Sequence, residues 1–227
     1  MNDHHRTRDG RGHATPIAGV VSRGHIFLLS PAKVGGPRTA MLLREQADFR
    51  LARRLREDGA TIGEIYSFIS GLYFRGKMMY AEAFRAAAPP GMPPALVIVP
   101  GAGLIPPQTT VSVTQLRTIA EISVDEDNPR FRDPLTEAAR LLDEHAEQGC
   151  SYVLLGSVAS AKYTAPLLKL FGDRLLFPPD FVGRGDMSRG GLMLRQARAG
   201  VELPYVSVQG APLHGARPPR LERWRKQ

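Results

Sequence analysis

The sequence predicts an α/β fold, with a single domain built on a mixed or mostly parallel central sheet flanked by helices. Short apolar runs alternate along the chain with segments of helical periodicity. Several of these runs end in loops rich in Gly, Ser, Lys or Arg, as strands of open α/β sheets do at their carboxyl ends. The length of 227 residues fits one domain. We expect this domain over 21–208, a disordered arm over 1–20 and a basic Pro/Arg-rich tail over 209–227.

The strands are predicted from runs of four to six residues that are mostly apolar. Gly, Pro or Ser bounds most of them, as is usual for strands buried on both faces. In chain order they are 25–30, 95–99, 151–155, 173–177 and 205–208.

The helices are predicted where apolar side chains recur with helical spacing. In chain order they are 39–58, a helix from 61 with a break near 71–76, 113–120, 134–148, a helix ending at 170, and 187–199. Thr61 and Glu64 have the spacing of a capping box, and Gly71 and Gly76 weaken the helix that follows. We expect Asp186 or Ser188 to cap the last helix.

The chain carries a net charge of +8 and has an isoelectric point near 10.0. This charge favours polyanionic partners such as nucleic acid, anionic lipid or phosphorylated ligands. Five basic residues crowd the last eleven positions: Arg217, Arg220, Arg223, Arg225 and Lys226. Others belong to the predicted domain: Arg44, Arg50, Arg53, Arg54, Arg56, Arg75 and Lys77. The basic excess is therefore not confined to the tail.

Cys150 is the only cysteine, so the chain cannot form an internal disulfide. No Cys or His residues have the spacing of metal ligands, and we expect no metal or other cofactor. A reducing, cytoplasmic location follows from this cysteine usage. The polar start of the chain lacks the apolar region of a signal peptide, and no apolar run is long enough to span a membrane.

Candidate binding residues lie in the loops that follow the predicted strands, where backbone N–H groups and helix N-termini attract anions. An aromatic side chain beside Arg and Lys in 73–77 also suits base stacking with phosphate contact. The candidates are Ser30, Lys33, Tyr73, Arg75, Lys77, Ser157, Ser160, Lys162, Tyr163, Arg184, Ser188, Arg189, Gly190 and Arg195. We expect the strand-end loops to converge on one cleft.

Structural explanations compete with this interpretation. In these explanations the arginine-rich helix face is a solvated surface, Ser30 only caps a turn, and the arginines after 183 pair with carboxylates. Asp186 is the candidate catalytic residue; two neighbouring arginines would lower its pKa, which suits electrostatic stabilisation better than general acid catalysis. Ser157 follows a strand, but no histidine motif places a base beside it, so a serine hydrolase is not favoured.

Several short motifs resemble the YaaA family, the bacterial DNA-binding peroxide-stress proteins. In order, they are Leu29-Ser-Pro-Ala-Lys33, Gly71-Leu-Tyr73 with Gly76 and Tyr80, Gly103-Leu104 before Pro106, Ala159-Ser160-x-Lys162-Tyr163, and Arg189-Gly190-x-x-Met193-x-Arg195. This chain differs at Asp186 to Ser188, where the family usually has a Lys, and at Gly156 to Val158, where it has an Asn. The resemblance implies an α/β protein with a positive cleft that binds DNA.

Three functions remain open at this point. The first is nucleic-acid binding, to DNA rather than RNA, with phosphates on the basic loops and a base on Tyr73 or Tyr163. The second is an enzyme that acts on a nucleotide or nucleobase in the same cleft, with glycosidic-bond or base-modification chemistry. The third is a non-catalytic scaffold whose basic surface is incidental.

Overall fold

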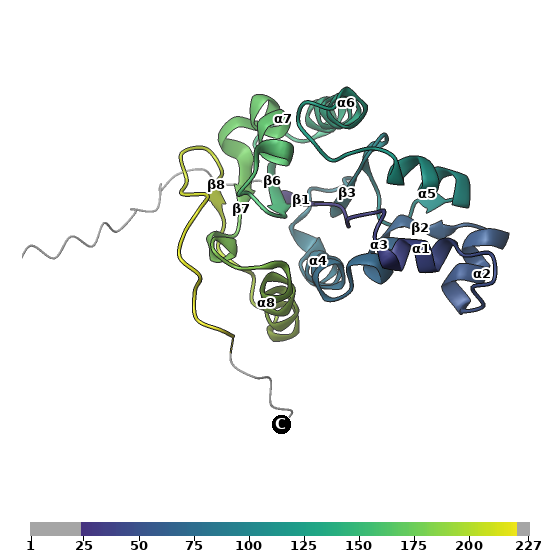
Figure 1. Cartoon of the computed structure of the whole chain (residues 1–227). Coiled ribbons are helices and arrows are strands. Elements are labelled where there is room, and N and C mark those ends of the chain that lie inside the picture. Colours follow the sequence, from purple (N-terminus) through teal and green to yellow (C-terminus); the bar gives the residue numbers. More distant parts are fainter. Residues whose placement is uncertain (1–23, 222–227) are drawn as a thin grey trace, which may run out of the picture.

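A six-stranded mixed sheet forms the centre of the molecule, in a computed structural model that describes residues 24–221 (Figure 1). The strand order is β4-β3-β1-β6-β7-β8. The strands are β1 (His25–Leu29), β3 (Ala95–Val99), β4 (Gly103–Ile105), β6 (Ser151–Leu155), β7 (Leu175–Phe177) and β8 (Val206–Ser207). The inner strands β3, β1, β6 and β7 are parallel, and the edge strands β4 and β8 are antiparallel to their neighbours. The α/β fold predicted from the sequence is confirmed.

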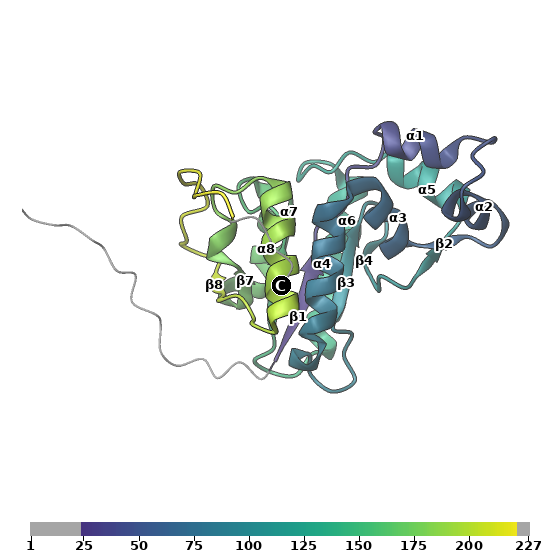
Figure 2. The ribbon, with the colours of Figure 1, turned by 90° about the horizontal axis from the view of Figure 1, so that it is seen from below.

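Helices cover both faces of this sheet. They are α1 (Pro37–Leu43), α2 (Arg50–Glu57), α3 (Ile62–Ser70), α4 (Leu72–Ala83), α5 (Val113–Ala120), α6 (Pro129–His145), α7 (Ala161–Phe171) and α8 (Asp186–Ala199). Helices α4 and α8 lie on one face and α6 and α7 on the other (Figures 1 and 2). Helices α1, α2, α3 and α5 lie beyond the β3 side of the sheet. A two-stranded antiparallel sheet, β2 (Ala60–Thr61) with β5 (Thr110–Val111), lies with them.

The core has two apolar layers because β1 alternates its side chains between the two faces of the sheet. Phe27 and Leu29 join the layer under α4 and α8, while Ile26 and Leu28 join the layer under α6 and α7. All four are at most 1% exposed. Continuous apolar runs of this kind are expected in parallel strands that are covered on both sides.

Helices α4 and α8 cross at two glycines, Gly76 and Gly190. A Cβ atom on Gly76 would lie 2.8 Å from the carbonyl oxygen of Gly190, and one on Gly190 would lie 2.8 Å from Tyr73 Cα. Neither position therefore has room for a side chain unless the helices move apart. This close contact sets α8, and with it Asp186 and Arg189, directly against α4.

The single helix predicted over 39–58 is wrong, because α1 ends at Leu43 and α2 begins at Arg50. Phe49 leaves the helical path and stacks on Phe68 of α3, with 5.2 Å between the ring centroids. Arg56 of α2 donates a 2.7 Å hydrogen bond to the carbonyl oxygen of Ala47 in the break. Packing and side-chain hydrogen bonds thus override the continuous apolar pattern.

The start of α6 and the edge strand β4 also differ from the prediction. Helix α6 begins at Pro129 rather than 134, because Asn128 accepts a 3.1 Å hydrogen bond from the Arg130 N–H and caps the helix. Pro134 consequently lies inside the helix. No sequence pattern predicts β4, which begins at Gly103. Gly103 has a φ of 75°, a backbone conformation that glycine adopts without strain.

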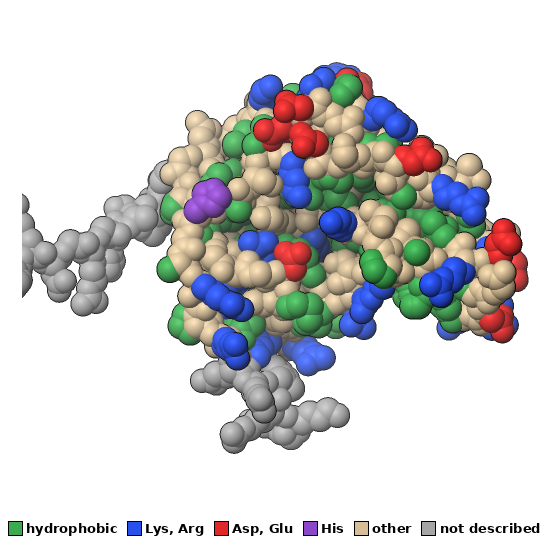
Figure 3. All heavy atoms as spheres, viewed as in Figure 1, with side chains coloured by type: hydrophobic (Ala, Val, Ile, Leu, Met, Phe, Trp, Pro, Cys, Tyr) green, Lys and Arg blue, Asp and Glu red, His purple; other side chains and the backbone are tan. Residues whose placement is uncertain are grey.

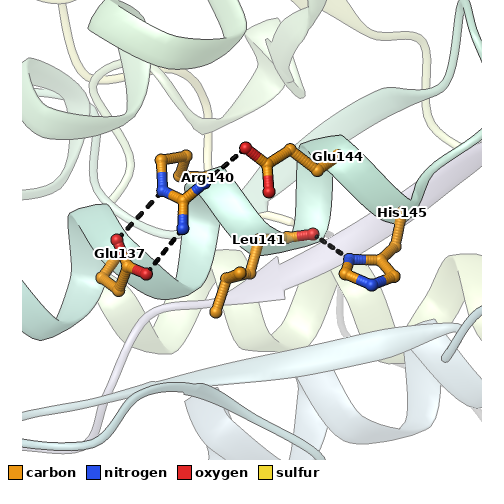
Figure 4. Close-up of polar contacts among 5 residues, drawn as sticks. All are labelled: Glu137, Arg140, Leu141, Glu144 and His145. Atoms are coloured by element: carbon orange, nitrogen blue, oxygen red, sulfur yellow. Dashed lines mark hydrogen bonds and ion pairs between the residues drawn. The ribbon is translucent and has the colours of Figure 1, made fainter.

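The outer face of α6 carries a group of surface ion pairs (Figure 4). Arg140 binds the carboxylates of Glu137 and Glu144. At the end of this helix, His145 Nδ1 lies 2.7 Å from the Leu141 carbonyl oxygen, one turn earlier. These residues stabilise the end of α6 and lie outside the cavity described below.

The arm predicted over 1–20 lies outside the described residues, and the tail predicted from 209 is described up to 221. In this described part, Ala211 and Leu213 pack against the apolar layer under α6 and α7, and Leu221 packs against the other layer. Within 24–221, no helix has the length and apolar character that a membrane span needs.

Candidate functional site

A cavity of about 610 Å³ opens at the carboxyl ends of β1, β3 and β6. Figure 3 shows a hollow near the middle of this face, with basic side chains and an acidic one at its border. One wall is apolar and comes from Val34, Ile69, Ile119, Ile122 and Val124. The rest of the lining is mostly polar or charged: Ser30, Lys33, Tyr73, Ser157, Lys162, Tyr163 and Asp186 all contribute. Its position is the one that α/β sheets commonly use for ligands.

Seven of the fifteen residues singled out in the sequence meet in this cavity. They come from four separate segments: the loop after β1, helix α4, the loop and helix start after β6, and the start of α8. Pro100, after β3, adds a fifth. The expected convergence of strand-end loops is thus seen for these residues, and it follows from the parallel order of β3, β1 and β6.

Lys77 lies directly beneath the cavity. Its side chain is 1% exposed, and its Nζ atom donates hydrogen bonds of 2.9 Å to the Ser30 carbonyl oxygen and 2.7 Å to Ser30 Oγ. The same atom lies 4.0 Å from the ring centroid of Tyr73. A side chain this deeply buried has no access to a solvent-borne phosphate. We therefore assign Lys77 to the support of Ser30 rather than to phosphate contact.

Burial lowers the pKa of Lys77 to about 7, because the charged ammonium is costly away from water. The carboxylate of Asp186 acts in the opposite direction, and the guanidinium of Arg189 adds to the lowering. The lysine thus changes its charge near neutral pH, with its nitrogen in contact with the hydroxyl of a residue that lines the cavity.

Three tyrosines contribute buried hydroxyls close to the cavity. Tyr73 and Tyr163 line it and are only 6% and 5% exposed, so neither offers a free ring face for stacking. The hydroxyls of Tyr66 and Tyr73 have no hydrogen-bond partner among residues 24–221. Burial raises the pKa of Tyr73 to about 12 and also raises that of Tyr163. Unpaired buried hydroxyls are costly, and a polar ligand or ordered water would satisfy them.

The start of α8 differs from the sequence prediction. Gly185 is the N-cap residue, and no side chain makes the capping hydrogen bond, so neither Asp186 nor Ser188 caps the helix. Asp186 is the first residue of α8 and lines the cavity, with Oδ1 at 3.5 Å from Arg189 Nη1. Arg189 is 7% exposed and donates from Nε to the Phe181 carbonyl oxygen over 3.2 Å. Its role is to fix the loop before α8.

Besides Lys77 and Arg189, six predicted residues lie outside the cavity lining. Arg75 is on the far side of α4, beside Met78, Met79 and Pro107. Arg184 donates to the Asp180 carbonyl and to Ser188 Oγ, over 2.9 and 3.3 Å. Gly190 faces the backbone of α4, which leaves no room for a phosphate. Ser160 precedes α7 as its N-cap, and Arg195 lies half-buried further along α8.

The sequence reasoning missed the apolar wall, which α3, α5 and the segment after α5 supply. It also missed the burial of Lys77. A signal for this burial was present, because Lys77 lies four residues after Tyr73 and four before Ala81, both of which are on the buried face of α4. Because this face of α4 packs against the core, a lysine at position 77 is expected to be buried.

Residues 24–221 contain no cluster of three His, Cys, Asp or Glu side chains with the geometry of a metal site. Comparisons of the chain with protein-family models, with curated proteins and with solved structures find no match. The cavity and its side chains therefore carry the functional argument.

Proposed function

We propose that the protein binds nucleic acid and that the cavity takes one nucleotide unit of the bound strand. The proposal is supported by the composition of the cavity, which combines an apolar wall with two lysines, Lys33 and Lys162. The lysines suit a phosphate, and the apolar wall suits the flat faces of a base. The net charge of +8 adds a general attraction for polyanions.

The size and chemistry of the cavity suit a nucleotide better than a duplex groove. Its volume of about 610 Å³ lies within the range of small-ligand pockets, roughly 300–1,000 Å³. Tyr73 and Tyr163 would contact a base through their edges and hydroxyls, because their ring faces are covered. A single strand, or a nucleotide turned out of a duplex, presents a base in the way this cavity requires. The preference for DNA over RNA rests on the resemblance to the YaaA family alone.

The proposal is tested by fluorescence anisotropy with single-stranded and duplex oligonucleotides across a series of salt concentrations. We expect tighter binding of the single strand and a linear fall of log K with log salt, because bound phosphates release counterions. Lys33→Gln and Lys162→Gln should each weaken binding and reduce the salt slope by about 1.

Lys169→Gln is the matched control for these two variants. Lys169 is an exposed lysine of α7 that lies beside Asp133 and Glu137, outside the cavity. It should change affinity only slightly, through the net charge. Equal losses in all three variants would show that binding depends on overall charge rather than on the cavity, and the absence of binding at low salt would refute the proposal.

A second candidate function is an enzyme that acts on a nucleotide or nucleobase in the same cavity. The observation that favours it is the contact of Ser30 with a buried lysine, close to the carboxylate of Asp186. Product analysis after incubation with nucleosides, nucleotides and modified DNA tests it. If Asp186 takes part in the chemistry, Asp186→Asn should abolish turnover and leave oligonucleotide binding in place. No product from any of these substrates would count against the enzyme.

A further inference from the structure

Ser30 occupies a defined place at the end of β1. Its backbone N–H donates to the Leu155 carbonyl oxygen over 3.3 Å, which continues the β1–β6 pairing by one residue. The neighbouring Gly156 leaves space for it, because a Cβ atom there would lie 2.9 Å from Ser30 Oγ. Ser30 is 4% exposed and is one of the residues that line the cavity, so it lies at the boundary between the core and the ligand space.

The contacts of Lys77 suit a neutral amine. A neutral amine has two N–H groups and one lone pair. The Ser30 carbonyl oxygen can only accept, so it takes one N–H over 2.9 Å. The Ser30 hydroxyl, 2.7 Å away, can donate to the lone pair. The geometry therefore allows the lysine nitrogen to receive the serine proton without movement of either residue.

We propose that Ser30 is a nucleophile and Lys77 its general base, in a reaction that transfers a phosphoryl group from a phosphate ester held in the cavity. Ser30 Oγ forms a bond to phosphorus while the bond from phosphorus to the leaving oxygen breaks. The Ser30 proton passes to Lys77 Nζ, and the leaving oxygen takes a proton from water in the cavity; Lys77 returns its proton to Ser30 Oγ in the second step. Water, or a second hydroxyl, then displaces the phosphoryl group from Ser30 and regenerates the hydroxyl.

The groups around the pair fit this division of roles. Lys77 is sealed from the cavity and can act only through Ser30. Lys33 and Lys162 line the same cavity as Ser30 and offer positive charge to the phosphate. The charged and titratable groups that act on Lys77 are Asp186 and Arg189 of α8, and its own helix adds Tyr73. Tyr73 stays protonated near neutral pH because its pKa is raised to about 12.

The nature of the substrate in this inference rests on the proposed nucleotide site, whereas the reactivity of Ser30 does not. The test therefore uses a small fluorophosphonate probe and intact-protein mass spectrometry on the full chain. Attack by Ser30 Oγ forms an O–P bond and expels fluoride, and Lys77 takes the proton. We expect a single adduct, located on Ser30 by peptide mapping, with a labelling rate that rises up to about pH 7–8 and then levels off.

Three variants accompany the wild-type protein. Ser30→Ala should abolish the adduct, and Lys77→Met should slow labelling by about 100-fold or more, the usual contribution of a general base. Ser67→Ala is the matched control, because Ser67 lies outside the cavity, beside Arg75 and Met79. This control should label at the wild-type rate. Circular dichroism establishes that each variant is folded.

Several results would overturn the inference: no adduct, an adduct on another residue, or an unchanged rate in folded Lys77→Met. If Lys77→Met does not fold, the wild-type pH profile decides, and a rate that keeps rising tenfold per pH unit through pH 9 excludes a base that titrates near neutrality. Failure of oligonucleotide binding with Ser30 labelling intact would refute the nucleotide site only. Binding without labelling would refute the nucleophile only.

Discussion

Replacement of Lys77 by methionine should change how the stability of the protein depends on pH. The lysine is 1% exposed, and burial lowers its pKa from 10.5 to about 7 in the folded protein. The unfolded chain therefore holds this proton more tightly than the folded one. Stability is lost as pH falls from 10.5 to about 7, and below pH 7 the loss is complete because both states carry the proton.

The size of this effect follows from the two pKa values. Each pH unit between them changes the free energy of unfolding by about 1.4 kcal/mol, and less close to pH 7, where the folded lysine is half protonated. Between pH 7 and pH 9 the wild-type protein should gain about 2 kcal/mol from Lys77, and Lys77→Met should not. Neighbouring Tyr73 does not contribute in this interval, since burial raises its pKa to about 12.

Urea denaturation followed by circular dichroism at pH 7, 8 and 9 measures the difference between the two proteins. We expect the free energy of unfolding of the wild type, minus that of Lys77→Met, to increase by about 2 kcal/mol over this range. Lys169→Met, at an exposed position, is the control and should show no such increase. A constant difference between wild type and Lys77→Met would refute a lysine that loses its proton near neutrality.

Three glycine substitutions, one of them a control, test the packing that holds the site. Gly190→Ala should lower stability by about 1–3 kcal/mol, or several degrees in melting temperature, because its Cβ would lie 2.8 Å from backbone atoms of α4. Gly191→Ala, whose Cβ would lie 3.5 Å from Leu221, should be neutral or slightly stabilising; thermal melts compare the two, and equal losses would contradict the close helix crossing. Gly156→Ala should slow fluorophosphonate labelling at least tenfold by displacing the Ser30 hydroxyl. A wild-type labelling rate in this variant would show that the position of the hydroxyl is not critical.

The sequence predicted the layer architecture because the parallel strands are uninterrupted apolar runs with loop residues at their ends. The runs at 25–30, 95–99 and 151–155 correspond to β1, β3 and β6, the three strands whose ends form the cavity. Ser30, Lys33, Ser157 and Lys162 follow these strands directly, so a parallel order alone brings them together. To predict this part of the cavity, one needs only local sequence patterns and the rule that parallel strands place their carboxyl ends at the same edge of the sheet.

The remaining part depended on packing that short-range patterns do not encode. Ile119, Ile122 and Val124 form part of the apolar wall only because α5 and the segment after it lie at the same cavity as the end of β1. No sequence motif predicts this arrangement. Gly190 looked like a residue for close phosphate approach, but it serves the approach of a helix instead. The charge of Lys77 predicts a surface position, but its place on the buried face of α4 puts it in the core.

The short motifs noted in the sequence have defined places in the structure. Arg189 and Gly190 hold α8 against α4 and fix the preceding loop. Gly71 ends α3 and starts α4 with a φ of 62°, which glycine adopts without strain. Residues from three of these motifs reach the cavity: Ser30 and Lys33 from the first, Tyr73 from the second, and Lys162 and Tyr163 from the fourth. Some residues of these motifs thus support the packing of α4 and α8, and others line the candidate site.

Photo-cross-linking with a single-stranded oligonucleotide that carries 5-iodouracil tests the central claim most directly. After irradiation, peptide mass spectrometry locates the residues that contact the base. The account predicts cross-links in the peptides that contain Tyr73 or Tyr163, the tyrosines that line the cavity, and their loss in Lys33→Gln with Lys162→Gln. Cross-links confined to the basic segments at 1–20 and 209–227, and unaffected by these substitutions, would contradict it.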